Sequence, residues 1–258
     1  MIKNYINNNF LIIYTVIAII YFIFFHIKPD RKNKIIYNYI NNKYITRCCN
    51  YSHSTHFVKN ESFPLISHLL IPNLICLFIM YNITSKNNGT RAEISTWIND
   101  SRVVNPSGAS CNLHLYIIAF LINDLITQFI KIIKLSPRPD IVDRIKFIKN
   151  NVTKEEQNIL HKINNQYLSH LLYDGYKSFI SGHASISFAT LTILSFMFLD
   201  NKDQLNTLNY LLSICILIFN LIYGSICSES RIIDNKHHTT DVLFGIIIGS
   251  IVPFFILK

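Results

Sequence analysis

The chain has 258 residues, of which half are hydrophobic and only 15% are charged, and its formal net charge is +9. This composition is too apolar for an ordinary soluble domain and indicates an integral, multi-pass membrane protein. The basic residues lie in separate loops without a nucleic-acid-binding motif, so we expect membrane lipids rather than nucleic acid as partners.

Six apolar runs approach the roughly 20 residues that a helix needs to cross a bilayer. They are Phe10–His26, Phe63–Ile83, Leu113–Ile133, Ser185–Leu199 with its flanks, Leu208–Ile226 and Val242–Leu257. We therefore expect an all-α integral membrane bundle of six transmembrane helices, forming a single domain over residues 1–258.

The first run also fits the apolar core of a signal peptide, because Lys3 precedes it. No small-residue cleavage pattern follows, which favours a retained helix. The six cysteines do not suggest a disulfide framework, since Cys76 and Cys215 fall inside apolar runs, where cysteine is usually a packing residue.

The polar segment 134–180 has a helical pattern of its own. Apolar residues recur at helical spacing from Ile145 to Leu171, and Thr153 with Glu156 fits a capping box. This pattern predicts an additional amphipathic helix in the third loop.

An even number of spans places loops 27–62, 134–180 and 227–240 on one side of the membrane. The third loop starts with "KIIKLSPRPD", in which Lys131 and Arg138 are seven residues apart and Pro137 and Pro139 predict that the helix ends. Taken alone, both cations fit ordinary snorkelling at the membrane edge.

The third loop ends with "SFISGHAS", which places a hydroxyl, a glycine and an imidazole together at Ser181, Gly182 and His183. Serine and glycine are favoured where a helix begins, so a plain helix cap is one interpretation. A helix start that binds phosphate and presents an acid is the other.

The fifth loop contains "SESRIIDNKHHTTDV", in which His237 and Asp241 are four residues apart. On a helix the two would share a face and could hydrogen-bond, which would fix the imidazole tautomer. Neither His237 nor His238 has a second ligand at zinc spacing. The alternative is a solvated helix start.

Together these clusters gather cations and donors that suit a tetrahedral phosphate dianion. The expected phosphate-binding residues are Lys131, Arg138, Ser181, Gly182 and Arg231. Two histidines can divide the chemistry, one attacking phosphorus and the other protonating the leaving oxygen.

The patterns KxxxxxxRP (residues 131–139), SGH (181–183) and SRxxxxxHxxxD (230–241) resemble the signature of the type 2 phosphatidic acid phosphatase and haloperoxidase superfamily. The surrounding residues look most like eukaryotic lipid phosphate phosphatases. The resemblance covers about residues 113–249.

This resemblance implies that His237 is the nucleophile, that Asp241 orients it, and that His183 is the general acid and later the base. It implies no metal and no cofactor. The implied activity is hydrolysis of lipid phosphate monoesters such as phosphatidate, in an endoplasmic-reticulum-like endomembrane or the plasma membrane. A lipid diphosphate phosphatase, a headgroup phosphotransferase and a non-catalytic scaffold or transporter-like relative are the alternatives.

The chain departs from the family pattern at Ile180, where proline is usual, and at Leu135 and Ser136, where glycine and arginine are common. We expect these departures to alter rate or substrate choice rather than to abolish the chemistry.

Family resemblance places the catalytic face on the lumenal or outer side of the membrane. The charge distribution opposes this orientation, because loop 27–62 carries seven Lys and Arg residues and cytosolic loops are usually the basic ones. We keep the family orientation as our expectation; the sequence does not specify the oligomeric state.

Overall fold

The structure, a computed structural model, describes residues 9, 12–20, 70–95, 108–151 and 166–258. Residues 12–20 are helical. The remaining helices are α4 (Ile71–Ser95), α5 (Gly108–Ile133), α6 (Ile141–Asn150), α8 (Gln166–Asp174), α9 (Gly182–Asn201), the 3-10 helix η3 (Lys202–Gln204), α10 (Thr207–Ile233) and α11 (Thr239–Leu257). Over the described residues the chain forms no strands, which agrees with the predicted all-α class.

Four segments are long and apolar enough to cross a membrane: α5 from Leu113, α9 with η3, α10 and α11. They confirm the last four of the six predicted runs. The apolar part of α4, Ile71–Thr84, is shorter. The total of six spans stays a prediction, because parts of the first two runs lie outside the described residues.

The helix ends differ from the predicted ones at two places. α10 continues to Ile233 and α4 to Ser95, each well past the apolar run that it contains. Polar residues such as Glu229 ended the apolar run of α10, but no proline or glycine follows there to stop the helix. Much of the predicted fifth loop is therefore helix. α5 ends at Ile133, before Pro137 and Pro139, as predicted.

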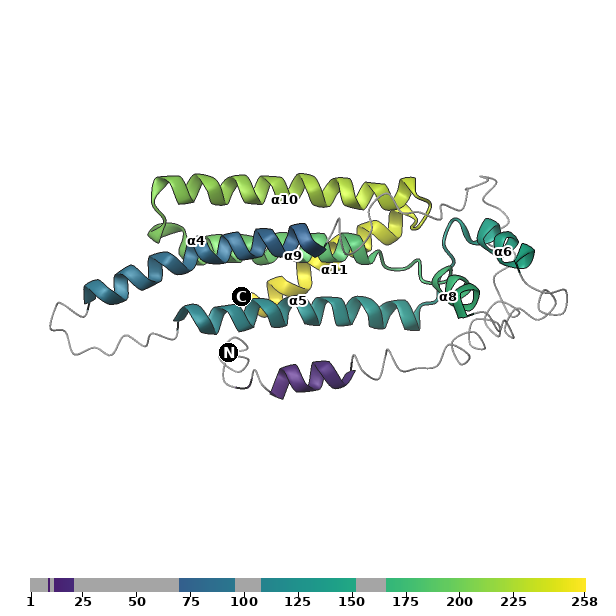
Figure 1. The fold of residues 1–258 in the computed structure, drawn as a ribbon, viewed down its shortest axis with the longest axis horizontal. Coiled ribbons are helices and arrows are strands. Elements are labelled where there is room, and N and C mark those ends of the chain that lie inside the picture. The colour runs from purple at the N-terminus through teal and green to yellow at the C-terminus, as the bar shows by residue number, and fades with distance from the viewer. Residues whose placement is uncertain (1–8, 10–11, 21–69, 96–107, 152–165) are drawn as a thin grey trace.

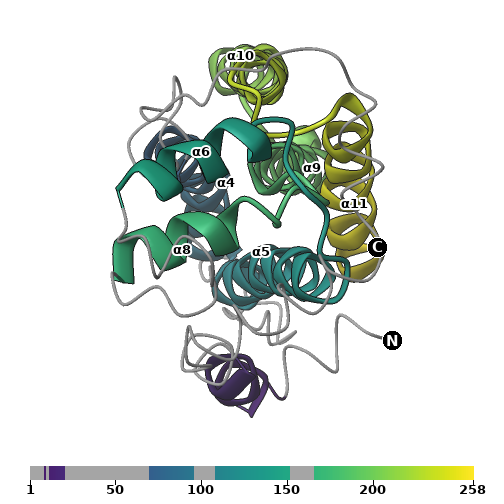
Figure 2. The same cartoon turned by 90° about the vertical axis from the view of Figure 1, so that its right-hand side faces the viewer.

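α9 is the central helix of the bundle. Figure 2 shows α4, α5, α10 and α11 arranged around it, and α9 contacts all four. In α9, 61% of the apolar stretch is buried inside the protein. In α5, α10 and α11 the buried share is only 28% to 33%. Small residues such as Ala184, Ser185 and Ala189 let the surrounding helices approach.

Two glycines bring α11 against the beginning of α9. A Cβ atom on Gly245 would lie 2.6 Å from the carbonyl oxygen of Ser181, and one on Gly249 would overlap the carbonyl of Ser185. Only glycine permits this backbone approach. The approach places the first turn of α11 beside the SGH segment.

α6 and α8 lie at one end of the bundle, which we call the site end (Figure 1). They share a small core in which Ile148 of α6 and Leu172 of α8 are buried. The predicted amphipathic helix in this loop stays a prediction, because residues 152–165, with its predicted capping box, lie outside the described residues.

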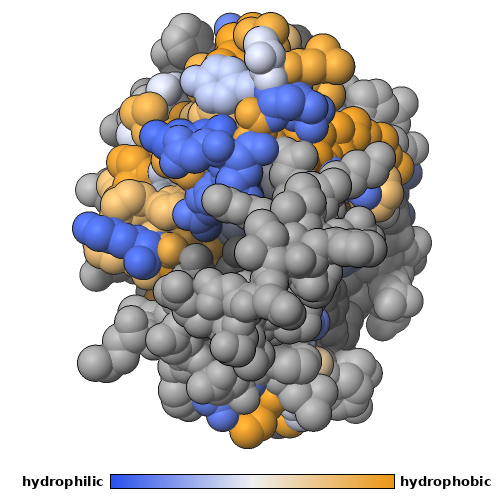
Figure 3. All heavy atoms as spheres, turned by 90° about the vertical axis from the view of Figure 1, so that its left-hand side faces the viewer, coloured by the Kyte–Doolittle hydropathy of each residue, from blue (hydrophilic) through white to orange (hydrophobic). Residues whose placement is uncertain are grey.

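Figure 3 views the opposite end of the bundle, where hydrophilic side chains gather beside apolar ones. There the exposed residues of η3 join α9 to α10. Such a short polar connection fits a loop at a membrane surface.

Candidate active site

Backbone hydrogen bonds join the two ends of the third loop. Ser136 N–H donates to Tyr176 O at 2.9 Å, Arg138 N–H to Gly175 O at 2.8 Å, and Ser178 N–H to Ser136 O at 3.0 Å. This pairing brings the segment after α5 beside the segment before α9, so the first two sequence motifs meet.

The third motif joins them through α11. Ser181 N–H donates to the Asp241 carbonyl at 3.0 Å, which links the start of α9 to the first turn of α11. All three predicted motifs therefore converge at the site end.

His237 lies in the turn between α10 and α11 and is 3% exposed. Its backbone N–H donates to Arg231 O at 3.2 Å, and its Nδ1 lies 2.6 Å from Ser178 O. A carbonyl oxygen can only accept, so Nδ1 must carry the proton in this bond. The lone pair of the neutral ring is then on Nε2, which is the atom available to attack phosphorus.

The charge state of His237 suits a nucleophile. Burial, followed by the positive charges of Arg138 and Lys131, lowers the pKa of this imidazole well below its usual value. The hydrogen bond to the Ser178 carbonyl raises this pKa and the charge of His183 lowers it, both to a smaller extent. His237 is therefore neutral at physiological pH.

The predicted hydrogen bond between His237 and Asp241 is not formed. His237 precedes α11 rather than lying on it, so the four-residue spacing does not place the two side chains on one helix face. Asp241 Oδ2 instead accepts the Ser178 hydroxyl at 2.5 Å and the His238 backbone N–H at 3.0 Å. Ser178 thus connects the two residues, with its carbonyl on His237 and its hydroxyl on Asp241.

The SGH segment forms the start of α9, as predicted. Ser181 is the N-cap, Gly182 is the first helical residue and His183 follows, half-buried, in the first turn. A Cβ atom on Gly182 would lie 2.9 Å from Lys131 Nζ, so the ammonium group lies against this helix start. Helix dipole and ammonium charge both favour an anion there.

Two buried donors at the site have no hydrogen-bond partner among the described residues. They are the Ser181 hydroxyl, on a fully buried residue, and Nε of Arg138, a residue that is 8% exposed. Buried donors in folded proteins are almost always paired. An oxyanion at this position would satisfy such donors, so the donor set fits a phosphate group.

Arg231, also predicted to bind phosphate, is 1% exposed in the last turn of α10. Its guanidinium donates to Asp234 Oδ2 at 3.0 Å and to Ser230 Oγ at 3.1 Å. Its carbonyl oxygen also accepts the N–H groups of Lys236 and His237. Arg231 therefore holds the turn that carries His237, and its role in binding phosphate stays a prediction.

The sequence reasoning missed Ser178 and Asp174. Asp174 accepts from Arg138 Nη2 at 2.9 Å, and Arg138 lies 36 residues earlier in the chain. No local spacing signals such a contact. Ser178 stands inside the quoted SFISGH segment, but nothing in its position predicts a hydroxyl aimed at Asp241.

The site thus combines a neutral imidazole, a second imidazole and several cations with unpaired donors. Within the described residues, no three His, Cys, Asp or Glu side chains gather in a way that could hold a metal ion. These features define a helical protein with apolar helices that could cross a membrane, and with a cationic, imidazole-containing site whose donor set fits a phosphate-like anion.

Comparison with known proteins agrees with this class. The family model of the PAP2 superfamily matches residues 112–258, more than half of the chain. The chain therefore belongs to the PAP2 superfamily, as the sequence motifs indicated. The matched region contains all three motifs.

Curated relatives include two proteins of Arabidopsis thaliana. Lipid phosphate phosphatase 1 is 34% identical over 137 residues, which cover 53% of this chain and 41% of the relative. Lipid phosphate phosphatase 2 is 34% identical over 140 residues, covering 52% and 46%. The chain thus spans less than half the length of these relatives. No solved structure matches it.

Proposed function

We propose that the protein is a lipid phosphate phosphatase that hydrolyses phosphate monoesters such as phosphatidate through a phosphohistidine on His237. The observation that carries the proposal is the surroundings of this residue. Its Nδ1 is held by the Ser178 carbonyl, which leaves Nε2 for attack, and burial together with the charges of Arg138 and Lys131 keeps the ring neutral. Family membership and the similarity to plant lipid phosphate phosphatases support the reaction class.

In the first half-reaction, Nε2 of His237 attacks phosphorus and the bond between phosphorus and the ester oxygen breaks. His183, protonated, donates its proton to the departing alcohol oxygen. Lys131, Arg138, Arg231 and the donors at Ser181 and Gly182 stabilise the charge on the transferring phosphoryl group.

In the second half-reaction, neutral His183 takes a proton from water and the hydroxide oxygen bonds to phosphorus. The bond between phosphorus and Nε2 breaks, which releases inorganic phosphate and restores the lone pair of His237. We propose that no metal takes part, because the residues that surround the phosphoryl group are themselves cationic.

The site end lies at the ends of the apolar helices (Figure 1). A lipid in the bilayer could therefore present its phosphate there while its acyl chains stay in the membrane. This placement supports a lipid rather than a soluble phosphate ester as substrate.

The test is phosphate release from phosphatidate in detergent micelles containing EDTA, with the natural protein, His237→Ala, His183→Ala and His170→Ala. His170 is exposed on α8 and serves as the matched control. We expect the first two variants to lose at least about a thousandfold in kcat and the control to keep it, because loss of a nucleophile leaves only the catalysis by positioned charges.

Release that requires a divalent cation, or that survives His237→Ala in folded protein, would contradict the mechanism. No release from phosphatidate, but release from a lipid diphosphate or transfer to an alcohol, would assign the site to one of the alternative reactions. Inactivity on all of these substrates would favour the non-catalytic scaffold.

A further inference from the structure

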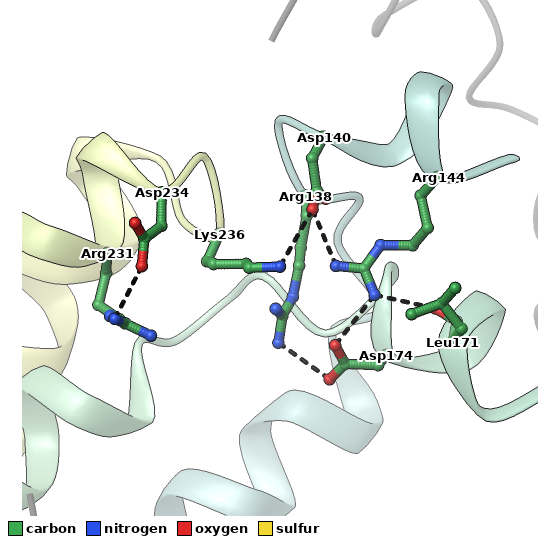
Figure 4. A network of polar contacts seen from close by, with 8 residues as sticks. All are labelled: Arg138, Asp140, Arg144, Leu171, Asp174, Arg231, Asp234 and Lys236. Atoms are coloured by element: carbon green, nitrogen blue, oxygen red, sulfur yellow. Dashed lines mark hydrogen bonds and ion pairs between the residues drawn. The ribbon is translucent and has the colours of Figure 1, made fainter. Parts of the chain in front are cut away.

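Beside the site, five buried or partly buried charged side chains alternate in sign (Figure 4). In spatial order they are Lys236, Asp140, Arg144, Asp174 and Arg138. The four successive ion pairs measure 3.5, 2.9, 3.1 and 2.9 Å. We call these five residues the charge chain.

Arg144 occupies the centre of the charge chain and is 1% exposed. Its Nη2 donates to Asp140 Oδ2, while its Nη1 donates to Asp174 Oδ2 and to the Leu171 carbonyl at 3.0 Å. The rigid guanidinium fork can hold two carboxylates at once, whereas a lysine ammonium cannot fix both directions.

The backbone around Arg144 makes room for it. A Cβ atom on Gly175 would lie 2.9 Å from Arg144 Cδ and 2.6 Å from Ile141 Cδ1. The carbonyl of Gly175 also accepts the Arg138 N–H. A side chain at residue 175 would therefore displace Arg144 and disturb the segment that carries Arg138.

One end of the charge chain is a residue of the proposed mechanism, Arg138, and the other end, Lys236, is next to one. At one end, Asp174 holds the guanidinium of Arg138. At the other end, Asp140 lies 3.5 Å from the ammonium group of Lys236, which is the residue before His237. The backbone N–H groups of Lys236 and His237 share one acceptor, Arg231 O, so one carbonyl fixes the backbone of both residues.

Stability alone does not account for this arrangement. Burying ion pairs costs desolvation energy, and well-packed apolar replacements are often as stable or more so. The charge chain holds three cations and two carboxylates, so it leaves a net positive charge beside the site. An excess of positive charge favours an anionic substrate.

Asp174 keeps its charge throughout. Burial alone would raise its pKa, but Arg138, Arg144, Lys131 and Lys177 outweigh that effect and lower the pKa to about 2. The hold on Arg138 is therefore constant across the pH range in which an imidazole titrates.

We propose that Arg144 is a positioning residue. Through Asp174 it orients Arg138, the proposed phosphate-binding residue, and through Asp140 it orients the turn that carries the proposed nucleophile. The inference rests on the proposed function, because it assigns these two branches to phosphate binding and to nucleophile placement respectively. Arg144 itself touches neither the substrate nor the reacting atoms.

The test compares Asp140→Asn, Asp174→Asn and Arg144→Lys in the full chain in detergent. Each variant keeps a side chain of similar size but removes a charge or the guanidinium fork. The control is Asp143→Asn on the same helix, because within the described residues Asp143 forms its ion pair with Lys146, whose side chain is 71% exposed. The readouts are kcat, KM, the inhibition constant of inorganic phosphate and the melting temperature.

We expect Asp140→Asn to lower kcat about tenfold or more with little change in phosphate inhibition, since small misplacements of reacting groups are costly. Asp174→Asn should weaken phosphate inhibition about tenfold or more, because Arg138 loses its orienting partner. Arg144→Lys should show both effects, and the control should show neither.

If all three variants lose only melting temperature and keep kcat, KM and phosphate inhibition, the charge chain is merely structural and the inference is wrong. A fully active Arg144→Lys would also overturn it. If the natural protein hydrolyses no lipid phosphate, the proposed function fails, and equilibrium binding of vanadate then tests the Arg138 branch. Unchanged vanadate binding by Asp174→Asn, or no binding by the natural protein, would overturn the inference as well.

Discussion

The residues around His237, the proposed nucleophile, determine the protonation state of this histidine. The Ser178 carbonyl fixes the proton on Nδ1, and burial with nearby cations disfavours a second proton on Nε2. A lone histidine would carry the second proton in part of the neutral range. His237 does not, because burial, followed by the charges of Arg138 and Lys131, lowers its pKa.

The pH dependence of turnover should reflect this environment. In the proposed mechanism, attack requires neutral His237, whose pKa is lowered. We therefore expect kcat to fall on acidification only well below pH 6.5, the usual pKa of histidine. The measurement is a kcat profile against pH for a lipid phosphate monoester. A second ester with a different phosphate pKa is the control, since the acid limb should not follow the substrate.

An acid limb at or above pH 6.5 that is the same for both esters would contradict this assignment. It would mean that His237 is solvated in the working enzyme or that another base limits the reaction.

Individual residues also show where sequence reasoning reached its limit. Lys131, Ser181, Gly182 and His237 were found because each stands in a short pattern beside an apolar run. Arg144 and Asp140 were missed although their four-residue spacing predicts an ion pair on a helix, because an exposed pair at this spacing is common and usually weak. The pair of Asp140 and Arg144 differs from such exposed pairs because both side chains are buried.

Among the elements, the contact between α9 and α11 bears most directly on the site. Gly249 and Gly245 let the two backbones meet, and Ser181 N–H then reaches the Asp241 carbonyl. A larger residue at either glycine must push the helices apart, because the atoms in its way belong to backbone.

We therefore expect Gly249→Leu to lower both thermal stability and kcat, with a loss on the order of 2 kcal/mol in the free energy of unfolding, as overpacking typically causes. Ile247→Ala is the control on the same helix, because Ile247 is 46% exposed and faces away from this contact. Thermal unfolding in detergent and phosphate release measure the two effects. Normal stability and activity of Gly249→Leu would show that the close contact between α9 and α11 is not needed to place Asp241 beside Ser181.

The elements themselves were largely predictable, since apolar length identifies a helix that crosses a bilayer and proline predicts the end of α5. The ends of α10 and α4 were not. The apolar run of α10 stops at Ile226, yet the helix continues to Ile233 because its last turns pack against protein and need no lipid-facing surface. Arg231 consequently lies on a helix rather than in a loop.

For the whole molecule, the orientation in the membrane decides which side the site end faces. α6 and η3 lie at opposite ends of the bundle, so Lys146 on α6 and Lys202 on η3 report on opposite faces (Figure 1). Both side chains are exposed. With the orientation implied by family resemblance, and with the protein produced in the plasma membrane, only the α6 side is reachable from outside.

We expect a membrane-impermeant maleimide to label Lys146→Cys in intact cells and Lys202→Cys only after permeabilisation. Mass spectrometry of the labelled peptides separates these sites from the natural cysteines. The reverse pattern would support the orientation favoured by the basic loop 27–62. Labelling of both positions in intact cells would contradict a bundle that crosses the membrane.

The pairing of Ser136 with Tyr176 and Ser178 also has a consequence for chain entropy. These hydrogen bonds hold the two ends of the third loop side by side and fix the distance between them. For such a closed loop, each doubling of length costs only about 0.6 kcal/mol. Residues can be gained or lost between α6 and α8 with little effect on the distance from Arg138 to Ser181, whereas a proline at residue 136 would remove one of the bonds that closes the loop.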